Sequence, residues 1–244
     1  MSIASRGIEG TTPSTLNSMK KLIPLIAILM FTSHVFASEL RVVCLGDSIT
    51  GPQPGMRYLD HYAQYADILQ VILETHLGVG NIEVVNRGFA GNTSTQALAR
   101  VDAEVVPLKP DIVTVLIGGN DYGGNGGAEV VGKQLRQNLV TIIEKVRKGG
   151  AKVLLMQYAD PKADNMEKVW THLNAGNPVI AEVALEENVP TVELAPAFRE
   201  AAKTHPLAEL ASPIDGVHLN PYGVITIART LYFKLAELGW IPKS

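Results

Sequence analysis

Four short segments of this sequence carry residues that could act together on one carbonyl group. Ser48 ends the tripeptide Gly46-Asp47-Ser48, and a serine hydroxyl becomes a good nucleophile only when a neighbouring base takes its proton. Asp215 and His218 lie three residues apart and offer both such a base and an acid to orient it. The pattern predicts a nucleophile–base–acid triad of Ser48, His218 and Asp215.

The same chemistry needs hydrogen-bond donors for the negative charge that develops on the carbonyl oxygen. The backbone N–H of Ser48 is one candidate. Gly91 offers a second, because no side chain obstructs its N–H, and the side-chain amide of Asn120 offers a third. Gly88 is the rival to Gly91. Losing one such donor typically slows an enzyme about a hundredfold or more.

The elements that must position these residues alternate between strands and helices. Apolar, β-branched runs predict buried strands at 40–45, 82–85, 111–117, 152–156 and 191–194. Helices are expected at 59–76, 95–105, 128–148, 166–173, 177–187, 196–203 and 221–238. Asn177-Pro178 and Asn220-Pro221 each read as an N-cap followed by proline.

This alternation predicts an α/β fold with three layers, in which helices cover both faces of a parallel sheet. Five strands favour the flavodoxin-like order 2-1-3-4-5. In that order Ser48 follows the first strand and Asn120 follows its neighbour, the third. Both residues are then expected at the crevice where the strand order reverses.

The composition fits one globular domain and narrows its partners. The chain has 244 residues, of which 46% are hydrophobic and 18% charged, enough for a sizeable core. The net charge of −3 and the lack of a basic stripe argue against nucleic acid. Cys44 is the only cysteine, so no internal disulfide can form, and we expect a small buried hydrophobic residue there. The sequence shows no Cys/His cluster of the kind that binds zinc, and we expect no metal or cofactor.

The first 37 residues read as an N-terminal extension and a secretory signal peptide. Met19-Lys20-Lys21 is basic, an apolar run covers 22–31, and Val35-Phe36-Ala37 resembles a cleavage site. We expect a true start at Met19, cleavage after Ala37, and export to the periplasm or the cell exterior. Residues 38–244 would form the single mature domain, without a membrane span. An anchor that stays attached to the membrane is the alternative.

The four segments together resemble the SGNH hydrolase superfamily, also called GDSL esterases and lipases. The matching blocks are Gly46-Asp47-Ser48, the stretch 86–93 that contains Gly91, Gly118-Gly119-Asn120-Asp121, and Asp215 to His218. The resemblance covers essentially all of the mature chain. It implies that Ser48 is the nucleophile, His218 the base and Asp215 its orienter, with Gly91 and Asn120 in the oxyanion hole.

These features predict a carboxylic ester hydrolase that works through an acyl-enzyme. Export and polar loops favour acetyl or other short-acyl esters of carbohydrates, and a thioesterase or lysophospholipase is the alternative. Arg57, Arg87 and Tyr122 are candidate substrate contacts, and each could equally be a surface or salt-bridging residue. A non-catalytic carbohydrate-binding relative and a flavodoxin-like nucleotide or phosphate binder also stay open.

Overall fold

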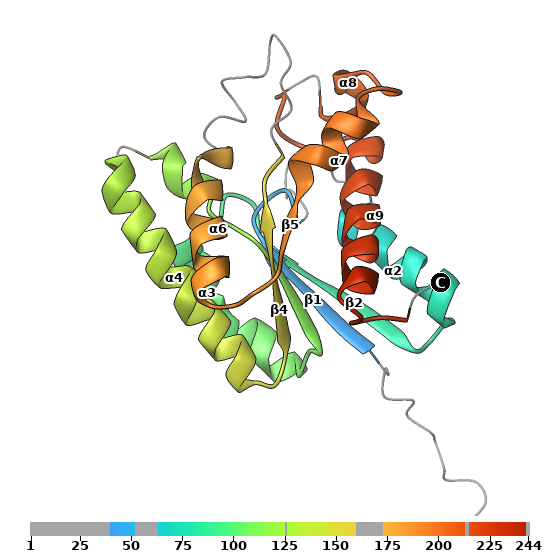
Figure 1. Cartoon of the computed structure of the whole chain (residues 1–244), viewed down its shortest axis with the longest axis horizontal. Coiled ribbons are helices and arrows are strands. Elements are labelled where there is room, and N and C mark those ends of the chain that lie inside the picture. Colours follow the sequence, from blue (N-terminus) through green and yellow to red (C-terminus); the bar gives the residue numbers. More distant parts are fainter. Residues whose placement is uncertain (1–39, 52–62, 125, 160–172, 213–214, 243–244) are drawn as a thin grey trace, which may run out of the picture. The chain divides into compact units, whose positions relative to one another are not determined.

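A five-stranded parallel sheet, in the order β2-β1-β3-β4-β5, organises the computed structural model of the chain (Figure 1). The strands are β1 Leu40–Gly46, β2 Ile82–Gly88, β3 Ile112–Leu116, β4 Lys152–Gln157 and β5 Thr191–Glu193. The structure describes residues 40–51, 63–124, 126–159, 173–212 and 215–242, all within one unit, Ser38–Ser244. The predicted fold class and strand order are confirmed.

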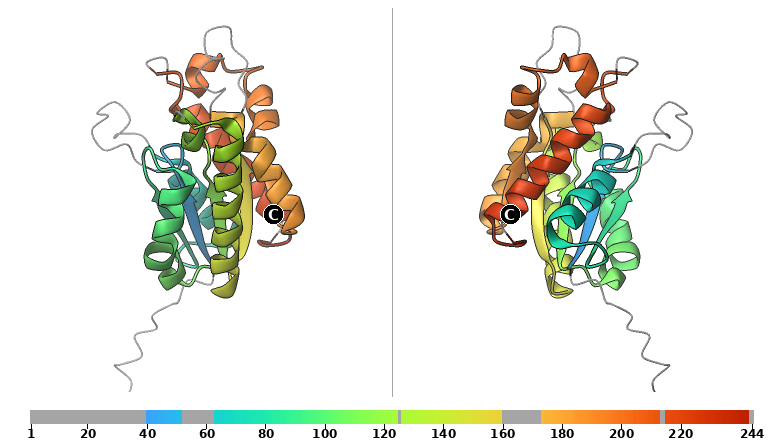
Figure 2. Two further views of the ribbon diagram at one scale, coloured as in Figure 1. Left: turned by 90° about the vertical axis from the view of Figure 1, so that its left-hand side faces the viewer. Right: turned by 90° about the vertical axis from the view of Figure 1, so that its right-hand side faces the viewer.

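Helices cover both faces of this sheet (Figures 1 and 2). The helices α3, α4 and α6 lie on one face, and α2 and α9 lie on the other. Their bounds are α2 Tyr65–Leu77, α3 Ser94–Arg100, α4 Ala128–Lys148, α6 Asn177–Glu186, α7 Leu194–Ala201, α8 Leu207–Leu210 and α9 Pro221–Glu237. The helix predicted at 128–148 is confirmed at both ends.

The register of the central strands brings three loops to one edge of the sheet. Gly46 at the end of β1 pairs with Gly88 of β2 and with Leu116 of β3. All three strands are parallel, so the chain leaves each of them at the same edge. The turn that carries Ser48 therefore lies between the loops that carry Gly91 and Asn120.

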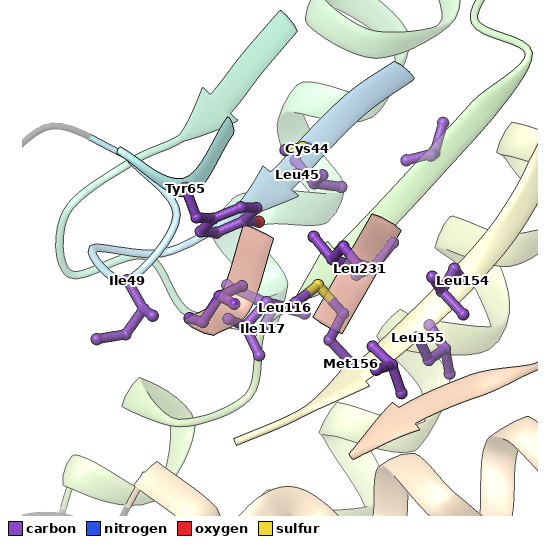
Figure 3. Close-up of a cluster of buried hydrophobic side chains, with 14 of the residues drawn as sticks. Cys44, Leu45, Ile49, Tyr65, Leu116, Ile117, Leu154, Leu155, Met156 and Leu231 are labelled. Carbon is purple, nitrogen blue, oxygen red and sulfur yellow. The ribbon is translucent and has the colours of Figure 1, made fainter. Parts of the chain in front are cut away.

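The core lies on both sides of the sheet and is dense with aliphatic side chains. Figure 3 shows Leu116 of β3 and Met156 of β4 beside Leu231 of α9, and all three side chains are fully buried. Cys44 is also fully buried, as predicted, and burial raises the pKa of its thiol to about 11. A thiol with so high a pKa stays protonated and inert at neutral pH.

Three predicted helices have different bounds. The helix expected at 196–203 spans Leu194–Ala201, because Pro196 lies within its first turn, where a helix does not need the missing N–H. The helix expected from residue 59 begins at Tyr65, because the Asp67 carboxylate accepts the Gln64 N–H at 2.7 Å and starts the helix there. The helix expected over 95–105 is α-helical only to Arg100. It continues as a π-helix, Val101–Val105, and a short 3-10 helix, Val106–Leu108.

The expected N-cap at Asn177 is wrong. Gly176 precedes the first helical residue, and Asn177 already belongs to α6. Its side chain is used elsewhere: Oδ1 accepts the N–H of Tyr158 at 2.8 Å, and Nδ2 donates to the Tyr158 carbonyl at 2.9 Å. These two bonds fix the chain at the end of β4. The helix expected at 166–173 lies almost wholly outside the described residues.

Candidate active site

A tight turn after β1 presents the Ser48 side chain. The Asp47 carbonyl accepts the N–H groups of Thr50 and Gly51, at 3.1 and 2.9 Å. A Cβ at Gly46 would lie 2.7 Å from the Leu116 carbonyl oxygen, so only glycine lets β1 end this close to β3. The turn is thereby held against the neighbouring strand, with Ser48 half-buried beside it.

The carboxylate of Asp47 is fully buried beneath this turn. Its Oδ1 accepts the Ile49 N–H at 2.9 Å, and its Oδ2 accepts the hydroxyl of Tyr158 from the end of β4. Burial raises the pKa of Asp47 to about 6, although both hydrogen bonds and the nearby His218 lower it. Burial likewise raises the pKa of Tyr158 well above its usual value, so this hydroxyl remains a donor.

The second pair of predicted residues lies on a bend before α9. His218 Nδ1 lies 2.8 Å from Asp215 Oδ2. The other carboxylate oxygen of Asp215 accepts the backbone N–H groups of Val217 and His218, at 2.9 and 3.0 Å. Gly216 has φ of +68°, which glycine adopts without strain. The carboxylate is thus fixed on both sides, and Nε2 of the imidazole is left to face another group.

Backbone hydrogen bonds close this bend by joining residues 218–220 to residues 210–212 at the end of α8. Ser212 N–H donates to the His218 carbonyl at 2.6 Å, and Asn220 N–H donates to the Leu210 carbonyl at 3.1 Å. The bend lies at the same end of the sheet as the turn after β1 (Figure 1). The His218 imidazole is one of the groups that lower the pKa of the buried Asp47 carboxyl, next to Ser48 in the sequence.

The two remaining segments meet through Asn92. Gly91 has φ of +74°, and Asn92 N–H closes a turn onto the Phe89 carbonyl at 3.1 Å. Asn120 Nδ2 donates to the Asn92 carbonyl at 3.0 Å. This bond orients the Asn120 amide, whose nitrogen carries a second N–H that can donate to an oxyanion.

Gly88 has a different task from Gly91. Its N–H donates to Asn86 Oδ1 at 2.8 Å, so the loop itself uses that donor. A Cβ at Gly88 would lie 2.1 Å from the Gly51 nitrogen. Gly88 therefore lets the loop after β2 pack against the turn after β1, and this geometry favours Gly91 over Gly88 as the oxyanion glycine.

A buried polar network behind the site was not predicted from the sequence. Both oxygens of Asp121 accept from Ser94, one from its N–H at 2.8 Å and one from its hydroxyl. Asn138 of α4 donates to the Ser94 hydroxyl at 2.8 Å. The network joins the Asn120 loop to the start of α3. The sequence signal was the directly adjacent Asn120-Asp121 pair, which reads equally well as a turn.

The candidate substrate contacts are placed as follows. Arg87 donates to the backbone carbonyls of Glu104 and Asn86, at 3.2 and 3.0 Å. Tyr122 lies in the short 3-10 helix Asn120–Gly123, is partly buried and packs against the core. Arg57 lies outside the described residues. A substrate role for these three residues stays a prediction.

Neither a metal centre nor a membrane helix occurs in the part of the chain that the structure describes. Within those residues no cluster of His, Cys, Asp and Glu could hold a metal ion. None of the helices described is both long enough and apolar enough to cross a bilayer.

Comparison with known proteins gives a consistent set of relatives. The model of the GDSL-like lipase/acylhydrolase family matches residues 44–224. Esterase TesA of Pseudomonas aeruginosa is 37% identical over 131 residues, which are 54% of this chain and 59% of that protein. The match therefore spans little more than half of each chain.

Two longer matches extend the comparison. The thioesterase 1/protease 1/lysophospholipase L1 of Escherichia coli is 28% identical over 198 residues, covering 81% of this chain and 84% of that protein. The structure of a mutant acetyl-xylooligosaccharide esterase from Geobacillus superposes with a TM-score of 0.66 and 25% identity. The superposition covers 85% of this chain and 98% of that esterase chain.

Proposed function

The chain belongs to the GDSL-like lipase/acylhydrolase family, and from that premise we propose a serine esterase that removes acetyl or other short acyl groups from saccharides. The observation that carries the proposal is the fixed pair of Asp215 and His218, with Nδ1 and Oδ2 2.8 Å apart. A histidine held in this way presents Nε2 as a base. Ser48, on the turn after β1, is the group it would serve.

In the first step Ser48 Oγ attacks the ester carbonyl carbon and transfers its proton to Nε2 of His218. Asp215 stabilises the resulting imidazolium through the bond to Nδ1. The tetrahedral intermediate places its oxyanion against the N–H groups of Ser48 and Gly91 and the amide of Asn120. Its collapse breaks the bond to the alcohol oxygen, which leaves with the proton from His218.

The second step repeats the chemistry with water. Water gives a proton to His218 and attacks the carbonyl of the acyl-enzyme, and the same donors hold the new oxyanion. Collapse returns the proton to Ser48 and releases the carboxylic acid. The two steps consume one ester and one water and need no cofactor.

Two features favour acetylated saccharides as substrates. A Geobacillus acetyl-xylooligosaccharide esterase shares the fold over 85% of this chain. The expected signal peptide, with cleavage after Ala37, would export the enzyme to the periplasm or the cell exterior, where polysaccharides occur. The Escherichia coli relative, named thioesterase 1/protease 1/lysophospholipase L1, supports the alternative of a thioesterase or lysophospholipase.

A substrate panel separates these alternatives. The purified protein is assayed on p-nitrophenyl esters from acetyl to palmitoyl, on an acyl-coenzyme A thioester, and on acetylated xylan oligosaccharides. We expect the highest kcat/KM for acetyl esters and release of acetate from the oligosaccharides. A preference for palmitoyl or for the thioester would refute the saccharide assignment and favour the lipolytic alternative.

Labelling tests the catalytic assignments themselves. A serine-directed phosphonate should modify Ser48 alone in the wild-type protein, and neither Ser48→Ala nor His218→Ala should be labelled. Ser48→Ala should lose more than 99.9% of its turnover while it remains folded. His76→Ala is the matched control, because His76 lies on α2 and stacks on Tyr232. A wild-type protein that resists the label would indicate a binding protein rather than an enzyme.

A further inference from the structure

Arg100, the last residue of α3, holds the loop that carries Gly91. Its side chain is only 16% exposed. The guanidinium donates from Nη2 to the Arg87 carbonyl at 3.2 Å and from Nε to Asn92 Oδ1 at 2.9 Å. Its Cζ also lies 5.6 Å from the centroid of the Phe89 ring. These contacts reach the start, the middle and the end of the loop 87–92, which includes the last two residues of β2.

The same contacts extend to the second oxyanion donor. Asn92 Oδ1 is held by Arg100, while the Asn92 carbonyl accepts from Asn120 Nδ2 at 3.0 Å. Asn92 itself is 7% exposed, so it has little freedom to move. The peptide of Gly91 and the amide of Asn120 are thus both oriented through one residue, and Arg100 fixes that residue.

The geometry requires an arginine. Three nitrogens of one planar group donate in three directions, since Nη1 also pairs with Glu104 Oε2 at 2.7 Å. A lysine ammonium keeps the charge but is a single point on a flexible stem, so it cannot span the loop from Arg87 to Asn92. Arg100→Lys is therefore a change of geometry at constant charge.

We propose that Arg100 is a positioning residue of the oxyanion hole. It acts through the loop 87–92 and touches no reacting atom. This inference rests on the proposed esterase function and adds the group that keeps Gly91 and Asn120 aimed at the same point. Preorganised donors stabilise the oxyanion because they need no reorientation during the reaction. Loss of Arg100 should therefore lower kcat and leave KM nearly unchanged.

The test compares Arg100→Lys with a matched substitution, Arg136→Lys. Arg136 also makes two contacts with its guanidinium, to Glu182 and Glu186, but these link α4 to α6 and not to the loop 87–92. With p-nitrophenyl acetate, Arg100→Lys should lower kcat at least tenfold with KM within twofold. Arg136→Lys should change neither. Circular dichroism and thermal unfolding establish that each variant is folded.

An arylboronic acid reads out the oxyanion hole directly. It adds to Ser48 as a tetrahedral anion, so its inhibition constant should rise in Arg100→Lys by the factor by which kcat/KM falls. Unchanged kcat, or a fall in kcat without weaker boronate binding, would overturn the inference. If Arg100→Lys does not fold, Asn92→Ala removes the same side-chain contact and must show the same paired losses.

The two proposals fail in different ways. A wild-type protein without Ser48-dependent ester turnover would overturn the esterase function, and this inference with it. An active wild type whose Arg100→Lys variant is equally active, with equal boronate affinity, would overturn the role of Arg100 alone.

Discussion

Replacing Tyr158 by phenylalanine removes one hydroxyl and keeps the ring that fills the core. That hydroxyl donates to Oδ2 of the buried Asp47 carboxyl. A hydrogen bond to a charged acceptor contributes roughly 1.5–3 kcal/mol to stability, and one between neutral groups roughly 0.5–1.5 kcal/mol. The cost of Tyr158→Phe should therefore depend on the charge of Asp47, and so on pH.

The direction of this pH dependence follows from the pKa of Asp47, which burial raises from 3.8 to about 6. Below pH 3.8 the Asp47 carboxyl is protonated in both the folded and the unfolded chain, so its raised pKa costs no folding stability. As the pH rises towards 6 the unfolded chain releases its proton first, so this residue contributes less and less stability. At about 1.4 kcal/mol per pKa unit, the total loss above pH 6 is roughly 3 kcal/mol.

Removing the Tyr158 hydroxyl adds to that loss, because its hydrogen bond lowers the pKa of Asp47. We expect Tyr158→Phe to reduce the free energy of unfolding by about 2 kcal/mol at pH 8 and by about 1 kcal/mol at pH 5. Urea denaturation followed by circular dichroism, with wild type and variant at each pH, measures both values. Other titrating groups cancel in the difference.

Tyr232→Phe is the control. Among the described residues, the hydroxyl of Tyr232 is buried and has no hydrogen-bond partner. Its removal should leave stability unchanged or higher, to the same extent at pH 5 and at pH 8. The reasoning about Asp47 would be refuted if Tyr158→Phe cost the same at both pH values, or cost more at pH 5.

Three further predictions test the loops and the core. Gly88→Ala should lower the free energy of unfolding by about 3 kcal/mol in urea denaturation, because its Cβ would meet the Gly51 nitrogen at 2.1 Å. Gly91→Ala should cost only about 1–2 kcal/mol by the same measurement, because its φ of +74° is strained for alanine but its surroundings are open. Cys44 should react with a colorimetric thiol reagent only after unfolding, since it is fully buried and its pKa is raised to about 11.

Much of the fold was predictable because its signals are local and periodic. The apolar run at 112–116 and the stripe of α4 each fix an element without help from the rest of the chain. The rule that parallel crossovers are right-handed and short then leaves few strand orders, and the predicted one is confirmed. The pairing of Asp215 with His218 is equally local, since both lie on one bend.

The errors and omissions arise where a side chain bonds to a distant segment. Asn177 was predicted as an N-cap because Asn-Pro commonly begins a helix, but its side chain instead holds the Tyr158 backbone, 19 residues away. Tyr158 follows the strand predicted at 152–156 and reads as the start of a polar loop. The hydrogen bond from Tyr158 to Asp47 joins residues 111 positions apart, and hydrophobic periodicity in a sequence does not predict contacts at that separation.

The difference between the predictable and the unpredictable residues has a physical cause. Ser48, Gly91 and Asn120 follow the carboxyl ends of neighbouring strands, and a strand end is visible in the sequence. The groups that hold them come from the elements packed behind, here Arg100 of α3 and Tyr158, which directly follows β4. Several residue types could fill such a place, and only the packed structure shows which one does. Residues that set how well the site works are therefore harder to predict than residues that define its reaction.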